Sequence, residues 1–590
     1  MPNRAAAPPS PDMVPFLSRP YGKPLTLLLS VLLLTLSFAP TKQFYLAWVG
    51  LVPWFCVLQA CTSQRRAFLW SWLGGTLFFI ANMWWLAFVT VPGMLALVIY
   101  LGLYWGLAGV IVRGFGWMNS RASRALPISS SDSQLVNQNP PGQTRRGLGM
   151  VFGIAVVWVA LEWIRGNFCT GLPWLYLGHT QSPLLLFCQV ADIGGVYAIT
   201  FWVVAVNAAV YYCIHREIWR WWAVGTVAIL LVGIGGYGLF RQGQTARITT
   251  PGPRIMVVQP NFPQDNGNKG ASEAEMVNFH LKATADGIKK LGRIDLACWS
   301  ETMMPPLNDE FLSALSSAKE PGEADSPRDR YRGVVDHIHQ LASENLTNII
   351  AGGLYYGGLD FKDGKGAFTD RRNTAYLFRT DGSMDDDHYD KIHLVPFGEF
   401  VPFKGSTLLG WLHGIFMSMS PYNYDYTLTP GSADAPTVFR LNIGGVPGAR
   451  VLTPICFEDI DAGLCAKLFR SPAGKRADLI VNLTNDGWFK ANENGQHLQA
   501  AVFRSIENRV PTARSVNTGI SGFIDSYGRV VDTVPVRAEG VAVQKVLLDP
   551  RYTLYTRVGD LFAWVCTLIT GVLTISALSD RFSRRRHVLK

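Results

Sequence analysis

Long apolar runs fill the first 240 residues of the chain, and one more lies near its C-terminus. Each run is close to the ~20 residues that a helix needs to cross the hydrocarbon core of a membrane. The runs cover residues 24–40, 44–61, 67–91, 93–117, 148–165, 184–213, 221–240 and 558–578. No small-residue cleavage site follows the first run, so we interpret it as a membrane helix and not as a signal peptide. The pattern predicts about eight transmembrane α-helices.

The pattern changes between residues 254 and 550. Short β-rich runs alternate there with helical patterns, in which apolar residues recur at three- and four-residue spacing. The predicted strands are 255–259, 294–299, 348–354, 374–379, 451–457, 479–483, 512–516 and 521–524. Because strands and helices alternate, the segment is predicted to be a layered α/β domain.

These patterns divide the chain into a membrane part and an α/β part. The predicted segments are a cytoplasmic tail at 1–23, a membrane domain of about seven helices at 24–240, the α/β domain at 241–555, a final transmembrane helix at 556–580 and a basic cytoplasmic tail at 581–590. Residues 119–147 are rich in Ser, Asn, Gln, Pro and Gly without apolar periodicity, which predicts a flexible loop inside the membrane domain.

Composition and charge agree with a membrane protein. The chain is 49% hydrophobic and only 16% charged, which is too apolar for an ordinary soluble protein. Its net charge of +10 comes from short Lys and Arg clusters beside the apolar runs, without a basic face interleaved with aromatic residues, so nucleic acid is not an expected partner. If every run crosses, most of these clusters lie on one side. The positive-inside bias then predicts cytoplasmic termini and a periplasmic α/β domain on the cell inner membrane.

The nine cysteines form neither a disulfide framework nor a zinc-site pattern, so we expect no metal and no cofactor. Most of them lie in or beside apolar runs, where a cysteine is a small packing residue. Cys456 is different, because it follows the apolar run 446–452 and precedes a helix-like segment. A sharp strand-to-helix turn exposes a side chain near backbone N–H donors, which makes Cys456 a candidate nucleophile. Burial as a packing residue, or a disulfide with Cys465, is the alternative.

Two further residues complete the chemistry of acyl transfer. Glu301 ends an apolar strand, and Lys391 lies in an otherwise apolar and aromatic segment. Acyl transfer needs a nucleophile, a base that deprotonates it and a cation near the developing oxyanion. Cys456, Glu301 and Lys391 are predicted to fill these three roles. The alternatives are a helix-capping or surface acid for Glu301 and a solvated strand-end residue for Lys391.

The sequence around these residues resembles the nitrilase superfamily, and within it the membrane-bound apolipoprotein N-acyltransferases. The glutamate, lysine and cysteine stand in that family's chain order. Three further segments are similar to other signatures of this family. They are Leu394-Val-Pro-Phe-Gly-Glu399, Asn482-Leu-Thr-Asn-Asp-Gly-Trp-Phe489 and the Gln496-His497 pair. The family carries a tryptophan on the loop after its first strand, and residues 259–270 have none.

The resemblance implies an αββα sandwich and a two-step reaction. In the first step, Cys456 takes a fatty acyl chain from a membrane phospholipid as a thioester. In the second, the α-amino group of the N-terminal diacylglyceryl-cysteine of an apolipoprotein receives the chain, which matures the lipoprotein. Phospholipid and apolipoprotein are therefore the expected partners, and we expect a monomer.

Three residues are predicted to support the catalytic group. Glu399 holds Lys391 or relays a proton to the incoming amine, Glu458 fixes the turn after the nucleophile, and the backbone N–H of Phe457 helps to bind the oxyanion. Glu399 and Glu458 could instead be purely structural acids.

Six further residues are predicted to line the site or the lipid path. Trp488 and Phe489 pack over the site. Trp411 and Phe416 lie in the apolar stretch 403–420, which is predicted to be a mobile arm that dips into the outer leaflet, with ordinary core packing as the alternative. Glu162 and Arg165, spaced i and i+3, either neutralise each other at the membrane interface or line a headgroup cavity.

Two other functions fit the sequence. One is a membrane-tethered carbon–nitrogen hydrolase, such as an amidase or nitrilase that releases ammonia from a small substrate. The other is a catalytically inactive membrane scaffold. A stable fatty-acyl thioester would exclude the first, and loss of function on Cys456→Ala would exclude the second.

Overall fold

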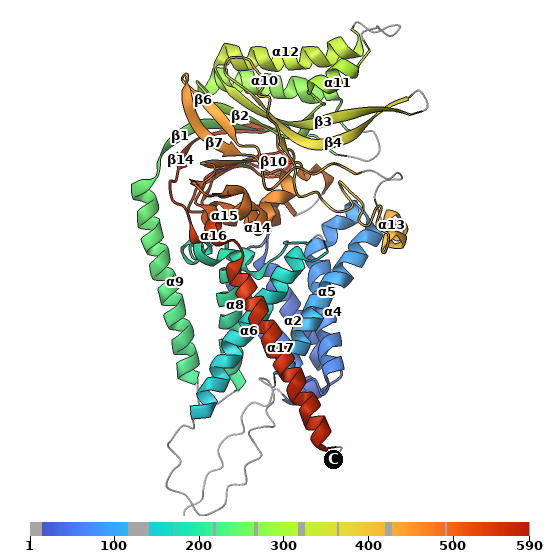
Figure 1. The fold of residues 1–590 in the computed structure, drawn as a ribbon. Helices are drawn as coiled ribbons and strands as arrows, with labels where there is room; N and C mark the ends of the chain where they lie inside the picture. The colour runs from blue at the N-terminus through green and yellow to red at the C-terminus, as the bar shows by residue number, and fades with distance from the viewer. Residues whose placement is uncertain are drawn as a thin grey trace, which may run out of the picture.

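The computed structural model describes residues 14–115, 141–169, 171–215, 220–264, 270–316, 325–362, 365–418, 420, 427–489 and 493–588. A layered α/β part lies on one end of a bundle of long helices, and the C-terminus lies at the opposite end of the bundle (Figure 1). The prediction for residues 1–13 and most of the predicted loop at 119–147 lie outside the described residues.

The bundle is formed by the N-terminal half of the chain and by the last helix. Its elements are α1 (Val14–Ser18), α2 (Gly22–Ser37), η1 (Phe44–Trp48), α3 (Val52–Gln59), α4 (Gln64–Met83), η2 (Trp84–Phe88), α5 (Val91–Gly114), α6 (Pro141–Asn167), η4 (Leu177–Gln181), α7 (Leu185–Cys188), α8 (Ala191–His215), α9 (Arg220–Ile248) and α17 (Leu561–Val588). In the described residues, five helices are long and apolar enough to cross a membrane: α5, α6, α8, α9 and α17.

The predicted count of eight crossings is therefore not confirmed. The first predicted run forms the 16-residue helix α2. The second is broken between η1 and α3, where Leu51 N–H donates to the side chain of Asn207 on α8 at 2.8 Å. The backbone N–H that the break leaves free is satisfied by a neighbouring helix, so the residues at the break can stay apolar. Apolar composition therefore does not reveal the break.

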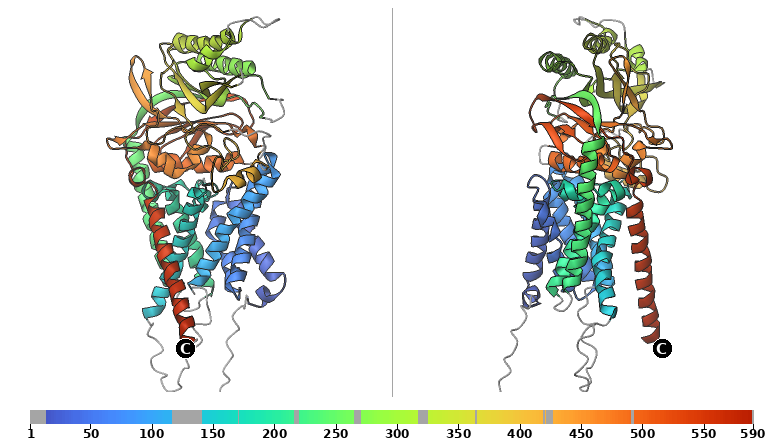
Figure 2. Two further views of the ribbon diagram at one scale, coloured as in Figure 1. Left: turned by 45° about the vertical axis from the view of Figure 1, so that its right-hand side comes forward. Right: turned by 90° about the vertical axis from the view of Figure 1, so that its left-hand side faces the viewer.

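The α9 and α17 helices form the rim of the bundle. Only 17% of the apolar window of each is buried, against 78% in α8. The α9 helix stands at the left edge of the bundle in Figure 1, and α17 stands at the right edge in the right-hand view of Figure 2.

The α/β part contains two six-stranded sheets. The first has the order β14-β1-β2-β3-β4-β5, and the second has the order β13-β12-β11-β10-β7-β6. The strands are β1 (Thr250–Gln259), β2 (Leu296–Met304), β3 (Asn348–Lys362), β4 (Lys365–Phe378), β5 (Tyr389–Asp390), β6 (Phe439–Ile443), β7 (Val446–Leu452), β10 (Leu479–Thr484), β11 (Thr512–Val516), β12 (Ser521–Ile524), β13 (Val530–Val534) and β14 (Gly540–Leu548); β8 (Arg470–Ser471) and β9 (Gly474–Lys475) form a separate small hairpin.

The sheets pack face to face because their inner sides are apolar. Val257 and Leu296 of the first sheet share a core with Val451 and Leu479 of the second. Ser515 on β11 fastens the sheets together, since its hydroxyl lies 3.0 Å from the carbonyl oxygen of Val258 and 2.9 Å from that of Cys298.

Helices cover both outer faces of this sandwich. The helices are α10 (Glu273–Leu291), α11 (Asp309–Ala314) and α12 (Pro327–Asn345) on the first sheet, and α14 (Ala462–Phe469), α15 (Glu493–Asn508) and α16 (Leu554–Val558) on the side that faces the bundle (Figure 1). This arrangement is the αββα sandwich that the resemblance implied.

The α15 helix joins the sandwich to the bundle. All its residues except Gly495 are buried, and polar side chains on its outer face bind the bundle. Ala39 N–H donates to Gln499 at 2.9 Å, Gln496 donates to the carbonyl of Asn82 at 3.0 Å, and Val196 N–H donates to Glu507 at 2.9 Å. Directional hydrogen bonds therefore fix the position of the sandwich on the bundle.

Candidate active site

The nucleophile candidate lies at the turn between β7 and the short helix η5 (Cys456–Ile460). Cys456 adopts φ 51°, in the left-handed region that non-glycine residues rarely occupy. Such strain is typical of functional sites. The residue is partly exposed and its thiol is free. Burial, and then the negative charge of Glu301, raises the pKa of Cys456 well above its usual range, while Lys391 opposes the shift. The resting thiol is therefore protonated and needs a base.

Glu301 is the base candidate, and a distortion of β2 sets its direction. The register between β2 and β3 shifts between Trp299 and Met304, and Thr302 has φ 53°. The Glu301 carboxylate is 5% exposed. It accepts hydrogen bonds from Lys391 Nζ at 3.0 Å, from Asn373 Nδ2 at 2.8 Å and from the backbone N–H of Asn485 at 2.8 Å.

Lys391 follows the short strand β5 and is 1% exposed. Its backbone N–H donates to the carbonyl of Asn373 at 2.8 Å. Its ammonium also lies 2.8 Å from Glu399 Oε1, in addition to its contact with Glu301. Burial alone would lower the pKa of Lys391, but the charges of Glu301 and Glu399 raise it well above its usual range. The side chain is therefore a fixed cation.

Glu399 shares its donors with Glu301. Asn373 Nδ2 lies 2.9 Å from Glu399 Oε1, and Val395 N–H donates to Glu399 Oε2 at 2.8 Å. Sequence reasoning missed Asn373, although its side chain touches both carboxylates. It lies inside β4 without a local motif, so no sequence signal marks it.

Glu458 lies two residues after Cys456 in the chain and accepts four hydrogen bonds. Its donors are Ile455 N–H at 2.6 Å, Ile392 N–H at 2.6 Å, His393 N–H at 3.0 Å and the Tyr389 hydroxyl at 3.0 Å. Burial raises the pKa of Glu458 to about 7, against the effect of the backbone N–H groups. The Glu458 side chain thus ties the segment of the lysine to the turn of the cysteine.

A second polar cluster lies next to the turn that carries Cys456. The sequence reasoning also missed this cluster. His497 bridges two carboxylates, with Nε2 2.7 Å from Asp459 Oδ1 and Nδ1 3.1 Å from Asp486 Oδ1. Arg514 of β11 contacts the other oxygen of Asp459. His497 and Asp486 stand within predicted motifs, but their contacts depend on the packing of α15.

Of the residues predicted to lie over the site, Phe489 contacts the bundle. Phe489 packs edge-to-face on Trp85 of η2 with 4.6 Å between ring centroids, and Trp488 is partly exposed. Phe416 of α13 (Gly410–Met417) packs against Phe397 and Phe403.

The α13 helix lies beside the upper ends of α4 and α5 (Figures 1 and 2). It has no buried residue, and Trp411 is 67% exposed. Core packing of Trp411 is therefore wrong, whereas the lipid arm stays a prediction.

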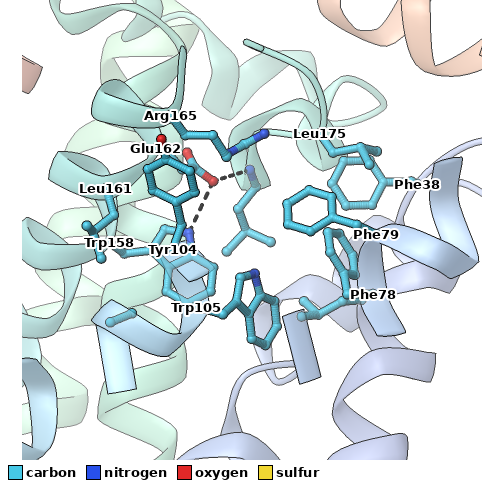
Figure 3. A pocket seen from close by; sticks show the side chains of 13 residues that line it. Phe38, Phe78, Phe79, Tyr104, Trp105, Trp158, Leu161, Glu162, Arg165 and Leu175 are labelled. Carbon is cyan, nitrogen blue, oxygen red and sulfur yellow. Dashed lines mark hydrogen bonds between the residues drawn. The ribbon is translucent and has the colours of Figure 1, made fainter. Parts of the chain in front are cut away.

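Glu162 and Arg165 bind different partners (Figure 3). Glu162 accepts from the Trp158 indole at 3.1 Å and from the N–H of Leu177 at 2.8 Å. Arg165 donates to the carbonyl of Trp174 at 2.6 Å. Both side chains therefore organise the loop before η4 through separate hydrogen bonds, and the charge of Arg165 also acts on Glu162. The two side chains also line a cavity of about 30 Å³, which is room for about two water molecules. Mutual neutralisation and a headgroup cavity both stay predictions.

The Cys456 thiol lies at the start of η5, the Glu301 carboxylate inside β2 and the Lys391 ammonium after β5, and the charges of Glu301 and Lys391 both act on the thiol. A thiol, a carboxylate and an ammonium together suit acyl transfer through a thioester. Among the described residues, no group of His, Cys, Asp or Glu side chains could hold a metal ion. Residues 255–552 match the family described as "Carbon-nitrogen hydrolase". Fold, site and match define an enzyme domain of the carbon–nitrogen hydrolase class, joined to helices that could span a membrane.

The membrane part identifies the family within this class. Residues 30–209 match the "Apolipoprotein N-acyltransferase N-terminal domain". Proteins named apolipoprotein N-acyltransferase are similar along most of the chain. That of Geobacter metallireducens is 29% identical over 95% of both chains, that of Bradyrhizobium diazoefficiens is 31% identical over 72% of this chain and 73% of its own, and that of Chlorobaculum tepidum is 27% identical over 95% of this chain and 98% of its own. The chain belongs to the apolipoprotein N-acyltransferase family.

Proposed function

We propose that this enzyme transfers a fatty acyl chain from a membrane phospholipid, through a thioester on Cys456, to the α-amino group of the N-terminal diacylglyceryl-cysteine of apolipoproteins. One observation carries the proposal. The buried Glu301–Lys391 pair, 3.0 Å apart, acts on the partly exposed thiol of Cys456. Cys456 itself packs against the apolar core between the two sheets, and the adjacent Phe457 packs in the same core as the bundle helices, so the turn of the nucleophile lies where the sandwich meets the bundle.

In the first step, Glu301 takes the proton of the Cys456 thiol, and the sulfur attacks the ester carbonyl carbon of the phospholipid. The ammonium of Lys391 and the N–H of Phe457 stabilise the oxyanion. The C–O bond then breaks, the lysophospholipid oxygen takes the proton from Glu301, and the acyl chain stays on sulfur.

In the second step, the α-amine of the acceptor attacks the thioester carbonyl, and the same two donors hold the new oxyanion. Glu301 takes a proton from the amine nitrogen. The C–S bond breaks, an amide forms, and the sulfur recovers its proton from Glu301. One base thus serves both steps, because it is ionised again after the first.

The proposed orientation places the sandwich in the periplasm, both termini in the cytoplasm and the monomeric enzyme in the inner membrane. The charges of Lys23, Arg66 and Arg113 all reach Cys61, so they gather at one end of the bundle. The positive-inside bias assigns that end to the cytoplasm. The exposed Trp411 would then lie at the outer leaflet, where an amphipathic arm can admit lipid.

The test is formation of an acyl-enzyme. Purified protein is incubated with phospholipid labelled in the acyl chain, and the expected result is a hydroxylamine-sensitive label on Cys456. Cys456→Ser should abolish this label, whereas Cys169→Ser, a change at an exposed cysteine, should keep it. Labelling that persists in Cys456→Ser, or release of ammonia from small amides without any acyl-enzyme, would overturn the proposal.

A further inference from the structure

We propose that His497 is a positioning residue, which holds the nucleophile turn and the loop that binds the base in register through one hydrogen bond to each. The inference rests on the proposed roles of Cys456 and Glu301, and its test is chosen so that the two can fail separately.

The two carboxylates that His497 bridges belong to the two loops that carry the chemistry. Asp459 lies in η5, three residues after Cys456. Asp486 opens η6 (Asp486–Trp488) and directly follows Asn485, whose N–H holds Glu301 at 2.8 Å. At the preceding residues the two segments are joined by a bridge between Ile455 and Leu483 and by a hydrogen bond from Asn482 Nδ2 to the carbonyl oxygen of Pro454 at 3.0 Å. The two bonds of His497 extend this pairing to Asp459 and Asp486.

Both ring nitrogens of His497 can donate only when the imidazole is protonated. The environment favours that form. Burial works against it, but the charges of Asp459 and Asp486 raise the pKa of His497 to about 9, with Arg514 opposing them. These three groups, from η5, η6 and β11, are the charged groups that face the ring. His497, Asp459 and Asp486 are each at most 3% exposed, so the bonds form in a poorly solvated site, where they are strong and directional.

The bundle also touches His497. The indole of Trp174 packs against the imidazole with 5.5 Å between ring centroids, and its N–H donates to Gln496, the preceding residue on α15, at 2.8 Å. The carbonyl of Trp174 is in turn held by Arg165. A contact chain therefore runs from the membrane loop through His497 to both catalytic loops.

The expected consequence is a loss of alignment, not of chemistry. Without two donors at position 497, Asp459 and Asp486 are no longer held together, and Glu301 is no longer aimed at the sulfur. A displacement of about 1 Å can cost roughly 100-fold in rate, so we expect His497→Gln to slow acyl-enzyme formation about 10- to 100-fold per titrated thiol. His339→Gln, on the remote helix α12, is the matched control and should change nothing.

A double-mutant cycle separates positioning from general structural damage. If His497 acts by aligning Glu301, its loss should matter little once Glu301 has been replaced by Gln, so the double variant should be about as slow as Glu301→Gln alone. Multiplicative losses in the cycle would overturn the inference. If His497→Gln does not fold, Asp459→Asn, which removes the charge at the other end of the same bond, replaces it in the cycle.

The thiol is also titrated without lipid, by its rate of alkylation with iodoacetamide from pH 6 to 10. His497→Gln is expected to lower this rate below about pH 9, where the wild-type imidazole is protonated, and the two profiles should converge as pH rises through 9. An unchanged profile in the folded variant would refute the positioning role. If the wild type is alkylated normally but never forms an acyl-enzyme, the proposed acyl transfer fails while the alkylation data still decide the role of His497.

Discussion

The proposed mechanism gives Lys391 a role in catalysis beside its role in stability, and the two contributions can be separated. Its ammonium lies 3.0 Å from Glu301 and 2.8 Å from Glu399, and the side chain is 1% exposed. Lys391→Met keeps the length of the side chain but leaves two carboxylates buried without a cation. Removal of one partner of a buried pair typically destabilises a protein by about 3–5 kcal/mol, and we expect a loss of this size.

A second substitution should restore stability but not activity. Adding Glu399→Gln to Lys391→Met removes one of the two uncompensated charges, and the amide can still accept from Val395 N–H. We expect recovery of about half of the lost stability, roughly 2 kcal/mol. Acyl-enzyme formation should stay about 10²- to 10³-fold below wild type, because the cation that faces the oxyanion is absent.

Two measurements on the same detergent-solubilised preparations test this reasoning. Unfolding is followed by circular dichroism in a denaturant series, and acyl-enzyme formation by transfer of label from phospholipid. Lys467→Met is the control, since this lysine pairs with Asp434 at the surface, where an exposed ion pair contributes little, and it should unfold as wild type does. A Lys391→Met variant as stable as wild type would refute the account of the buried pairs. A double variant that regains acyl transfer would refute the role of Lys391 as oxyanion donor.

Three further predictions concern other parts of the site. Gly519→Ala would place a Cβ atom 2.4 Å from Asp486 Oδ2, so iodoacetamide should alkylate the catalytic thiol at least about 10-fold more slowly; Gly225→Ala, in open space, should match wild type. Trp411→Ser should keep alkylation by this soluble reagent but slow transfer from phospholipid vesicles, and equal losses in both assays would contradict the lipid arm. Because the pKa of His497 is raised from 6.5 to about 9, its stabilisation of about 3 kcal/mol should be complete below pH 6.5 and vanish as pH rises through 9. The unfolding free energies of wild type and His497→Gln should therefore converge over that range, and a constant difference would contradict it.

Local sequence patterns were sufficient to predict most of the sandwich. The predicted strands 512–516 and 521–524 coincide with β11 and β12, and the apolar run 446–452 coincides with β7. All residues of β11 and β12 are buried, although Arg514 and Ser515 interrupt the apolar pattern of β11. The strand predicted at 451–457 is wrong, because the chain leaves β7 after Leu452 and turns into η5. The turn depends on hydrogen bonds to Glu458 from residues more than 60 positions earlier.

Elsewhere, contacts between segments far apart in the chain limited what the sequence could predict. Leu498, Val502 and Ile506 recur at four-residue spacing, which predicts an amphipathic helix with these residues on its apolar face, but nearly all residues of α15 are buried. Its polar face is not solvated, since it binds Asn82 and Val196 of the bundle. A sequence pattern reports polarity and cannot say whether the partner is water or another helix.

The polar character of this interface has a consequence for how the enzyme can work. Apolar layers can slide past each other, because dispersion is not directional, whereas a buried hydrogen bond that is broken leaves an unsatisfied group at a cost of about 1–3 kcal/mol. The sandwich is held on the bundle by several such bonds and by the buried ion pair of Arg509 with Asp192 at 2.7 Å. Rocking of the whole sandwich would break them together. We therefore expect lipid to reach Cys456 by movement of a segment outside this network. The α13 helix, which buries none of its residues, is a described segment that could move without breaking these bonds.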